Sequence, residues 1–294
     1  PISYYIKEGP AEIKGDQIVF TPIPPRSKFP VKVTVVAWQY GIAGKVQTAE
    51  PVERSFYILK SGETADFKSG RIDVGNGSLY YEEAGSGEPV IFVHGHSLDH
   101  RMWDEQFAEF AKEYRVIRYD LRGYGASSSQ TEDYQFTHVQ DLVTLMDSLH
   151  IRKAHIVGLS LGGNIRKSKG PSQPMTKEEA LKRDEEIAAL KVKGVDVMKR
   201  EWFEGLMSSG GTRKERMRQP LWEMIDDWDA WQPLHKEVRV VAGLDAYEAI
   251  KKNHPTVPTL IVEGKSPNNR YSNQPEILKY LPNGKLKVLE DCGH

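Results

Sequence analysis

The sequence predicts an α/β protein with a mostly parallel central sheet, preceded by a small all-β domain, and three observations carry that prediction. Apolar and polar residues alternate up to about residue 59, as they do in half-buried strands. From residue 71 onward, apolar runs alternate with helix-like stretches, a pattern typical of a parallel sheet. The third is a strand-like run that ends in Gly158-Leu-Ser160-Leu-Gly162, a pattern in which a strand turns sharply into a helix.

Length, charge and cysteine content narrow the class of protein. The chain has 294 residues, enough for one large domain or for a domain with a small companion. Its net charge of -1 provides no basic surface, so nucleic acid is not an expected partner. No apolar run approaches the roughly 20 residues that cross a bilayer, so we expect no membrane span. The single cysteine, Cys292, excludes an internal disulfide.

Residues 1–59 are predicted to form a small β-sandwich domain. Strand-like runs separated by Gly, Pro and Asn/Asp clusters occupy residues 2–6, 17–20, 31–38 and 52–58. The region resembles the immunoglobulin-like domains fused to secreted bacterial enzymes, although four or five strands are fewer than a complete sandwich uses. We expect a spacer that stabilises or orients the enzyme, with contact to glycans or to a surface as the alternative.

The start of the chain leaves two cellular locations open. Pro1 leads directly into strand-like sequence, with no signal peptide before it. The protein is then either cytoplasmic, or secreted or periplasmic with its signal peptide removed. We favour a secreted or periplasmic location.

A polar stretch containing Gly and Ser at residues 60–70 is predicted as a linker, and residues 71–294 as the α/β domain. Gly75-Asn-Gly77 between two short strand-like runs indicates an opening hairpin. The apolar run at residues 89–93 lacks polar alternation, as in a strand that is covered on both faces. A helix, a strand, a second helix and the strand before Ser160 follow in turn.

Ser160 is the predicted nucleophile. A serine at such a strand-to-helix turn has strained backbone and an exposed hydroxyl, and bulky residues two positions away on either side would clash. Gly158 and Gly162 occupy those two positions.

Several further motifs occur in a fixed order between residues 72 and 294. They are His94-Gly95, Trp103, Asp120-Leu-Arg-Gly-Tyr-Gly-Ala-Ser127, Asp141-Leu142, Gly158-Leu-Ser-Leu-Gly-Gly163, Val257-Pro-Thr-Leu-Ile-Val-Glu-Gly264 and Asp291-Cys-Gly-His294. Together they resemble the α/β-hydrolase superfamily. The resemblance implies an α/β-hydrolase fold, with His294 as general base and the backbone N–H groups of His96 and Leu161 as oxyanion donors. It implies no metal and no organic cofactor.

Three polar residues of these motifs are interpreted as structural. His94 is expected to hold its loop by hydrogen bonds, and Asp120 with Arg122 to form a pair that braces a loop. The ring of His96 is a candidate for lining the acyl pocket.

The carboxylate that would orient His294 is not at its usual place. Most relatives carry an Asp three residues past the glycine matched by Gly264, where this chain has Pro267-Asn268. Proline cannot orient an imidazole. Glu263 and Asp291 are the nearest carboxylates in sequence, so the acid is unassigned, with Glu263 as a candidate. Some members supply the acid from the end of the preceding strand, which this sequence lacks.

The sequence after the turn departs from the family. Ile165 runs straight into a polar, loop-like stretch at residues 166–174, where relatives continue with a helix and another central strand. Deleting an interior strand would expose the edges of its two neighbours. The hypothesis is therefore that a segment is omitted between Ile165 and Arg166.

A charged helical region follows and corresponds to the lid of relatives, at about residues 170–254. The 3.6-residue period at residues 177–190 predicts an amphipathic helix. Its large apolar residues are candidates for the roof of an acyl site or for ordinary packing: Trp202, Phe203, Leu206, Met207, Trp222, Trp228 and Trp231. Either role favours a small-molecule substrate with an apolar moiety.

These residues together predict a serine hydrolase that cleaves carboxylic esters or related acyl compounds through an acyl-enzyme intermediate. A perhydrolase or haloperoxidase-like activity would use the same residues. A binding protein that kept the fold without catalysis is the alternative from another class, favoured by Pro267-Asn268.

Overall fold

In the computed structural model the chain forms two compact units, Pro1–Ala65 and Asp66–His294. The residues that the structure describes are 2–15, 17–24, 27, 31–41, 44–45, 47–58, 67–131, 136–164, 176–212, 214–235, 246–265 and 275–292. Among these residues, no helix combines the length and the apolar character needed to cross a membrane.

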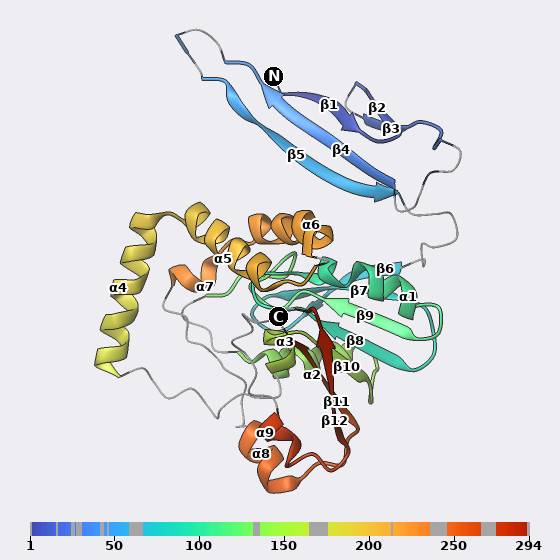
Figure 1. Ribbon diagram of the computed structural model, residues 1–294, viewed down its shortest axis with the longest axis vertical. Helices are drawn as coiled ribbons and strands as arrows, with labels where there is room; N and C mark the ends of the chain where they lie inside the picture. The colour runs from blue at the N-terminus through green and yellow to red at the C-terminus, as the bar shows by residue number, and fades with distance from the viewer. Residues whose placement is uncertain are drawn as a thin grey trace. The chain divides into compact units, whose positions relative to one another are not determined.

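The first unit is built from antiparallel strands. They are β1 (Ser3–Glu8), β2 (Ala11–Lys14), β3 (Gln17–Phe20), β4 (Val31–Gln39) and β5 (Ala49–Ile58). A three-stranded sheet has the order β1-β4-β5, and β2 pairs with β3 in a separate hairpin (Figure 1). Val33 and Val36 on the central strand are fully buried. The four strands expected from alternation are present, β2 is an additional one, and the likeness to an immunoglobulin domain stays a prediction.

The second unit contains a mixed five-stranded sheet. Its strands are β6 (Phe67–Asp73), β7 (Ser78–Ala84), β8 (Pro89–Val93), β9 (Arg115–Tyr119) and β10 (His155–Gly158). The order is β10-β8-β9-β7-β6, with β8 parallel to both β9 and β10, whereas β7 is antiparallel to its neighbours (Figure 1). Residues 67–70 belong to β6, so the predicted linker is wrong there: these residues pair with β7 across the hairpin.

The interior strand β8 is covered on both faces, as its uninterrupted apolar sequence predicts. Ile91 and Val93 pack with the helix α2 (His138–Ser148) through Leu142 and Leu145. Phe92 points to the other face, where its ring lies 5.0 Å from Trp103 and 5.4 Å from Phe110. Trp103 ends the short 3-10 helix η1 (His100–Trp103), and Phe110 ends α1 (Asp104–Phe110).

Helices follow in the second half of the chain. They are α3 (Leu161–Asn164), α4 (Lys177–Lys193), α5 (Val195–Ser209), α6 (Lys214–Asp227), α7 (Trp231–Leu234), α8 (Ala246–Asn253) and α9 (Pro275–Leu278). Helix α4 confirms the amphipathic helix expected there, and a capping box between Thr176 and Glu179 fixes its start. Helices α5 and α6 lie against the loop after β8, because Phe203 and Met224 pack with Leu98 in one buried cluster.

The last two strands stand apart from the main sheet. β11 (Thr259–Lys265) and β12 (Gly284–Glu290) form a parallel pair of their own. Parallel sheets normally have both faces covered, yet Leu260 and Val262 are 61% and 54% exposed. Within the described ranges no strand joins β10 to this pair. That separation is what the hypothesis of an omitted segment expects, but Ile165 and Arg166 lie outside the described residues.

Candidate active site

Ser160 occupies the sharp turn between β10 and α3. Its φ angle is 50°, in the left-handed region that non-glycine residues rarely adopt. The turn is closed by a hydrogen bond of 2.8 Å from the Gly162 N–H to the Leu159 carbonyl. Strain of this kind is concentrated at functional sites, because the surrounding structure must hold it in place.

The two flanking glycines are required by space. A Cβ on Gly158 would lie 2.5 Å from the backbone carbon of Gly162. A Cβ on Gly162 would lie 2.3 Å from the Val93 carbonyl oxygen. The clash expected from the sequence is confirmed, and it joins the turn to the end of the neighbouring strand β8.

The loop that follows β8, residues 94–100, faces this turn and is called the oxyanion loop below. A Cβ on Gly95 would lie 3.6 Å from the Cβ of Ser160, so the two segments are in direct apposition. His96 is the next residue of the loop, and Leu161 is the first residue of α3. The two backbone N–H groups predicted as oxyanion donors therefore come from the segments that meet at Ser160.

The His96 ring is surrounded by aromatic side chains. Its Nδ1 lies 2.7 Å from the Tyr124 hydroxyl. Edge-to-face contacts join it to Tyr124 at 5.8 Å, to Trp202 at 5.9 Å and to Trp228 at 4.9 Å between ring centroids. Trp202 comes from α5 and Trp228 directly follows α6. The helical region thus brings two of its tryptophans to the oxyanion loop.

The other predicted roof residues have different neighbours. Phe203 and Trp222 pack against each other at 5.2 Å, in the cluster that also contains Leu206 and Met207. Trp231 stacks on His235 at 4.4 Å. These contacts are those of ordinary packing, and the role as a roof stays a prediction.

His94 has the structural role that was expected. The Leu121 N–H donates to its Nε2 at 2.9 Å, so the ring proton is on Nδ1, which lies 2.7 Å from the Gly95 carbonyl. Burial lowers the pKa of His94, which keeps the ring neutral. A neutral ring with both nitrogens engaged is a brace for its loop.

Asp120 and Arg122 brace loops, but not as the predicted pair. Arg122 makes a bidentate contact with Asp141 of α2, at 2.8 and 3.0 Å, and donates to the Val74 carbonyl. Asp120 accepts from the backbone N–H groups of His100 and Ala126, each at 2.7 Å. The two side chains meet different elements: Arg122 contacts α2 and the turn before β7, whereas Asp120 contacts the oxyanion loop and the segment after β9.

Only some of the residues considered for the acid and the base of the predicted triad lie among the described residues. Glu263 is half-buried on β11. Asp291, just after β12, accepts from the Thr212 N–H at 3.0 and 3.1 Å and from the Thr212 hydroxyl, so the loop between α5 and α6 holds its carboxylate. Pro267-Asn268 and His294 lie outside the described residues.

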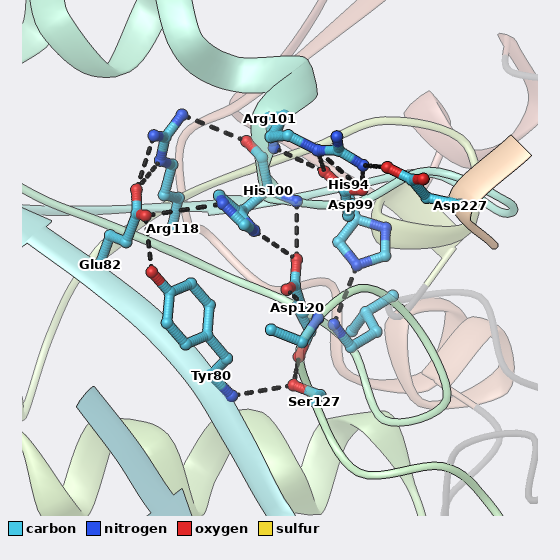
Figure 2. Close-up of polar contacts among 12 residues, drawn as sticks. Tyr80, Glu82, His94, Asp99, His100, Arg101, Arg118, Asp120, Ser127 and Asp227 are labelled. Carbon is cyan, nitrogen blue, oxygen red and sulfur yellow. Dashed lines mark hydrogen bonds and ion pairs between the residues drawn. The ribbon is translucent and has the colours of Figure 1, made fainter. Parts of the chain in front are cut away.

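A polar cluster beside the oxyanion loop was missed by the sequence reasoning. Asp99, His100 and Asp120 place potential ligand atoms within 4.8 Å of one another, close enough to hold a metal ion. Those atoms already have hydrogen-bond partners, however, because the Arg101 guanidinium contacts Asp99 at 2.6 Å and His100 Nδ1 lies 2.8 Å from Asp120 (Figure 2). The arrangement is that of a hydrogen-bond network. Asp99 and His100 close the loop opened by His94-Gly95, which is the signal that could have found them.

A cavity of about 270 Å³ adjoins this cluster. Its lining combines the apolar Leu98, Met224 and Trp228 with the charged Arg101 and Asp227. Trp228 also contacts the His96 ring, so the cavity lies next to the candidate site, with Trp228 between them.

Several curated proteins are similar to part of this chain. A putative non-heme chloroperoxidase from Synechocystis sp. is 41% identical over 86 residues, which are 29% of this chain and 31% of that protein. The 3-oxoadipate enol-lactonase 1 of Acinetobacter baylyi is 36% identical over 74 residues, 25% of this chain and 28% of that protein. The chain thus spans about a third of the length of the curated relatives it matches.

Solved structures share the fold. The esterase EaEST from Exiguobacterium antarcticum matches with a TM-score of 0.59 and 23% identity, over 77% of this chain and 92% of that chain. At this identity the likeness shows the fold alone. The family model described as "Alpha/beta hydrolase family" matches residues 90–294, more than half of the chain. The chain therefore belongs to the alpha/beta hydrolase family.

Proposed function

We propose that the protein is a serine hydrolase that cleaves carboxylic esters or related acyl compounds, lactones included. The observation that carries the proposal is Ser160 itself, held at a φ of 50° between two glycines at which a Cβ would clash with neighbouring backbone atoms. Such a turn presents the hydroxyl toward the apposed oxyanion loop. A carboxylate at this position would favour dehalogenase or epoxide hydrolase chemistry, and a serine does not.

The reaction follows from the residue types. The Ser160 oxygen attacks the acyl carbon while His294 takes the hydroxyl proton, and backbone N–H groups of His96 and Leu161 stabilise the oxyanion. His294 then returns the proton to the leaving alcohol, which leaves an acyl group on Ser160. Water, activated by the same histidine, releases the acid. The group that orients His294 is unassigned, with Glu263 as a candidate.

The substrate class follows from the surroundings of the oxyanion loop. Trp202 and Trp228 bring apolar surface to His96, and we propose that helices α4–α7 act as a lid over an apolar acyl or alcohol group. A small molecule is the expected partner. For residues 1–59 we propose a spacer domain, with glycan or surface contact as the alternative, and for the protein a secreted or periplasmic location.

A second candidate activity is supported by the likeness to a protein named as a putative non-heme chloroperoxidase. Hydrogen peroxide in place of water would attack the acyl group on Ser160 and release a peracid. Formation of peracid from acetate and peroxide, abolished by Ser160→Ala, would distinguish this activity from hydrolysis alone.

Labelling by a fluorophosphonate probe tests the proposal. Stoichiometric labelling of the purified protein is expected, lost in Ser160→Ala and kept in Ser208→Ala, whose exposed serine lies on α5. Absence of labelling in a folded sample would contradict the proposal and favour a binding protein that has the fold without catalysis.

A further inference from the structure

The oxyanion loop is anchored at both ends to the segment that follows β9. At its start, the Leu121 N–H donates to His94. At its end, the His100 N–H donates to Asp120 Oδ1 at 2.7 Å, and His100 Nδ1 lies 2.8 Å from the same oxygen (Figure 2). One buried carboxylate oxygen therefore holds both the backbone and the ring of His100.

Asp120 is itself fixed on all sides. Its Oδ2 accepts from the Ala126 N–H at 2.7 Å, and its carbonyl accepts from the Ser127 hydroxyl at 2.6 Å. A Cβ on Gly125 would lie 2.3 Å from Oδ2, so the chain can wrap the carboxylate only with glycine there. The anchor of His100 is thus a rigid one.

The other side of the His100 ring faces charged groups from the sheet. Its Nε2 lies 3.6 Å from Glu82 of β7, and the Tyr80 hydroxyl donates to the same Glu82 oxygen at 2.8 Å. Arg118 of β9 pairs with Glu82 at 2.6 Å and donates to the His100 carbonyl at 3.4 Å (Figure 2). The ring therefore bridges two carboxylates that belong to different elements.

These surroundings favour the charged ring. Burial acts to lower the pKa of His100, but the hydrogen bond to Asp120 and the charges of Asp120, Asp99 and Glu82 outweigh it and raise that pKa. The pKa of Asp120 is lowered, since its contacts with His100 outweigh burial, which would raise it. A charged bridge on a buried anchor holds the end of the loop more firmly than a neutral contact would.

The middle of the loop needs such an anchor. Ser97 has a φ of 62°, in the left-handed region, and its hydroxyl donates to the His96 carbonyl at 2.6 Å. Trp202 donates to the Ser97 hydroxyl at 2.7 Å. Strained backbone persists only when its surroundings hold it, and His96, the proposed donor, lies immediately before this residue.

We infer that His100 is a positioning residue, which through its contacts with Asp120 fixes the oxyanion loop and so aims the His96 N–H at the reacting oxygen. The catalytic consequence rests on the proposed serine hydrolase function. The structural consequence, a loop ordered by the His100 ring, does not.

Two variants of similar size separate the contacts of the ring. In His100→Asn the side-chain amide can stand where Nδ1 stood and still donate to Asp120. In His100→Gln the amide reaches instead toward the position of Nε2, beside Glu82. His155→Ala is the matched control, because His155 is an exposed histidine at the start of β10, with Glu88 as its partner.

Turnover of p-nitrophenyl butyrate gives the first readout. We expect kcat of His100→Gln to fall by about 10- to 100-fold with KM changed by less than about twofold, because an oxyanion contact is made in the transition state. His100→Asn should keep most of kcat, and His155→Ala all of it. Equal kcat values for the Asn and Gln variants would overturn the inference.

Hydrogen exchange of the backbone amides gives a readout that needs no activity. The peptide covering residues 94–103 should exchange faster in His100→Gln than in wild type, and as in wild type in His100→Asn and His155→Ala. Unchanged exchange in His100→Gln would overturn the inference whatever the kinetics. If wild type neither labels with fluorophosphonate nor turns over ester, the proposed function fails, while faster exchange in His100→Gln would still support the positioning role.

Discussion

The two halves of the candidate site differ in how firmly the surrounding structure holds them. On the nucleophile side, Ser160 and the oxyanion loop rest on β8 and on the buried side chains of His94 and Asp120. On the acid side, Glu263 lies on β11, whose only partner among the described strands is β12. Apolar residues of that pair are exposed, whereas those of β8 are buried. The first half is fixed by its own contacts, and the second depends on surfaces that the described residues leave uncovered.

The largest expected effect tests how strongly buried charges hold the nucleophile side. Arg122→Met should lower the free energy of unfolding by about 3–5 kcal/mol, because Asp141, 3% exposed, would be left buried without its partner. Arg218→Met on α6 removes an exposed ion pair with Glu215 and should leave the free energy of unfolding nearly unchanged, because solvent screens that pair. Urea unfolding measures both, and similar losses would contradict the contrast between buried and exposed pairs.

Substitution of one apolar residue in each sheet tests whether the two sheets differ in burial. Ile91→Ala on β8, at 0% exposure, should cost about 2–5 kcal/mol, as large-to-small changes in a packed core do. Leu260→Ala on β11, at 61% exposure, should cost less than about 0.5 kcal/mol. A loss for Leu260→Ala as large as that for Ile91→Ala would mean that β11 is covered in the folded protein, and the two halves would then be equivalent.

Glycine-to-alanine substitutions test how tightly the backbone around Ser160 is constrained. Gly162→Ala should cost about 1–3 kcal/mol and abolish fluorophosphonate labelling, because its Cβ would meet the Val93 carbonyl oxygen. Gly205→Ala is the matched control inside α5, where a Cβ meets nothing within 4 Å, and it should stabilise by about 0.5–1 kcal/mol. Thermal unfolding and fluorophosphonate labelling measure the two effects. A stable, labelled Gly162→Ala protein would show that the turn is not constrained as described.

The features that could be predicted from the sequence lie mostly on the Ser160 side of the site. Most of the strands, the turn at Ser160, its glycines and the bracing by His94 were predictable, because each depends on residues close in sequence or on a steric rule. The partners of Asp120 and Arg122 were not, since hydrogen bonds to His100 and Asp141 join residues about 20 positions apart. The separation of β11 from β10 depends on pairing over a still longer range. Local rules predict a nucleophile, whereas the groups that would orient its base are set by the fold.

The smallest expected effect concerns pH and isolates the contribution of His100. Its pKa in the folded protein is raised above the unfolded value of about 6.5. The stability that it contributes is therefore fully present below about pH 6.5 and is lost as the pH rises through the folded pKa. The pKa of His94 is lowered, mainly by burial, which gives a contribution of the opposite sign that wild type and His100→Asn largely share. Urea unfolding at about pH 5.5, 7.5 and 9 should therefore show that the free energy of unfolding of wild type increases relative to that of His100→Asn as the pH falls. A difference that stays constant across this range would mean that the bridge between Asp120 and Glu82 does not depend on a charged ring, and that hydrogen bonding to Asp120 alone orders the end of the oxyanion loop.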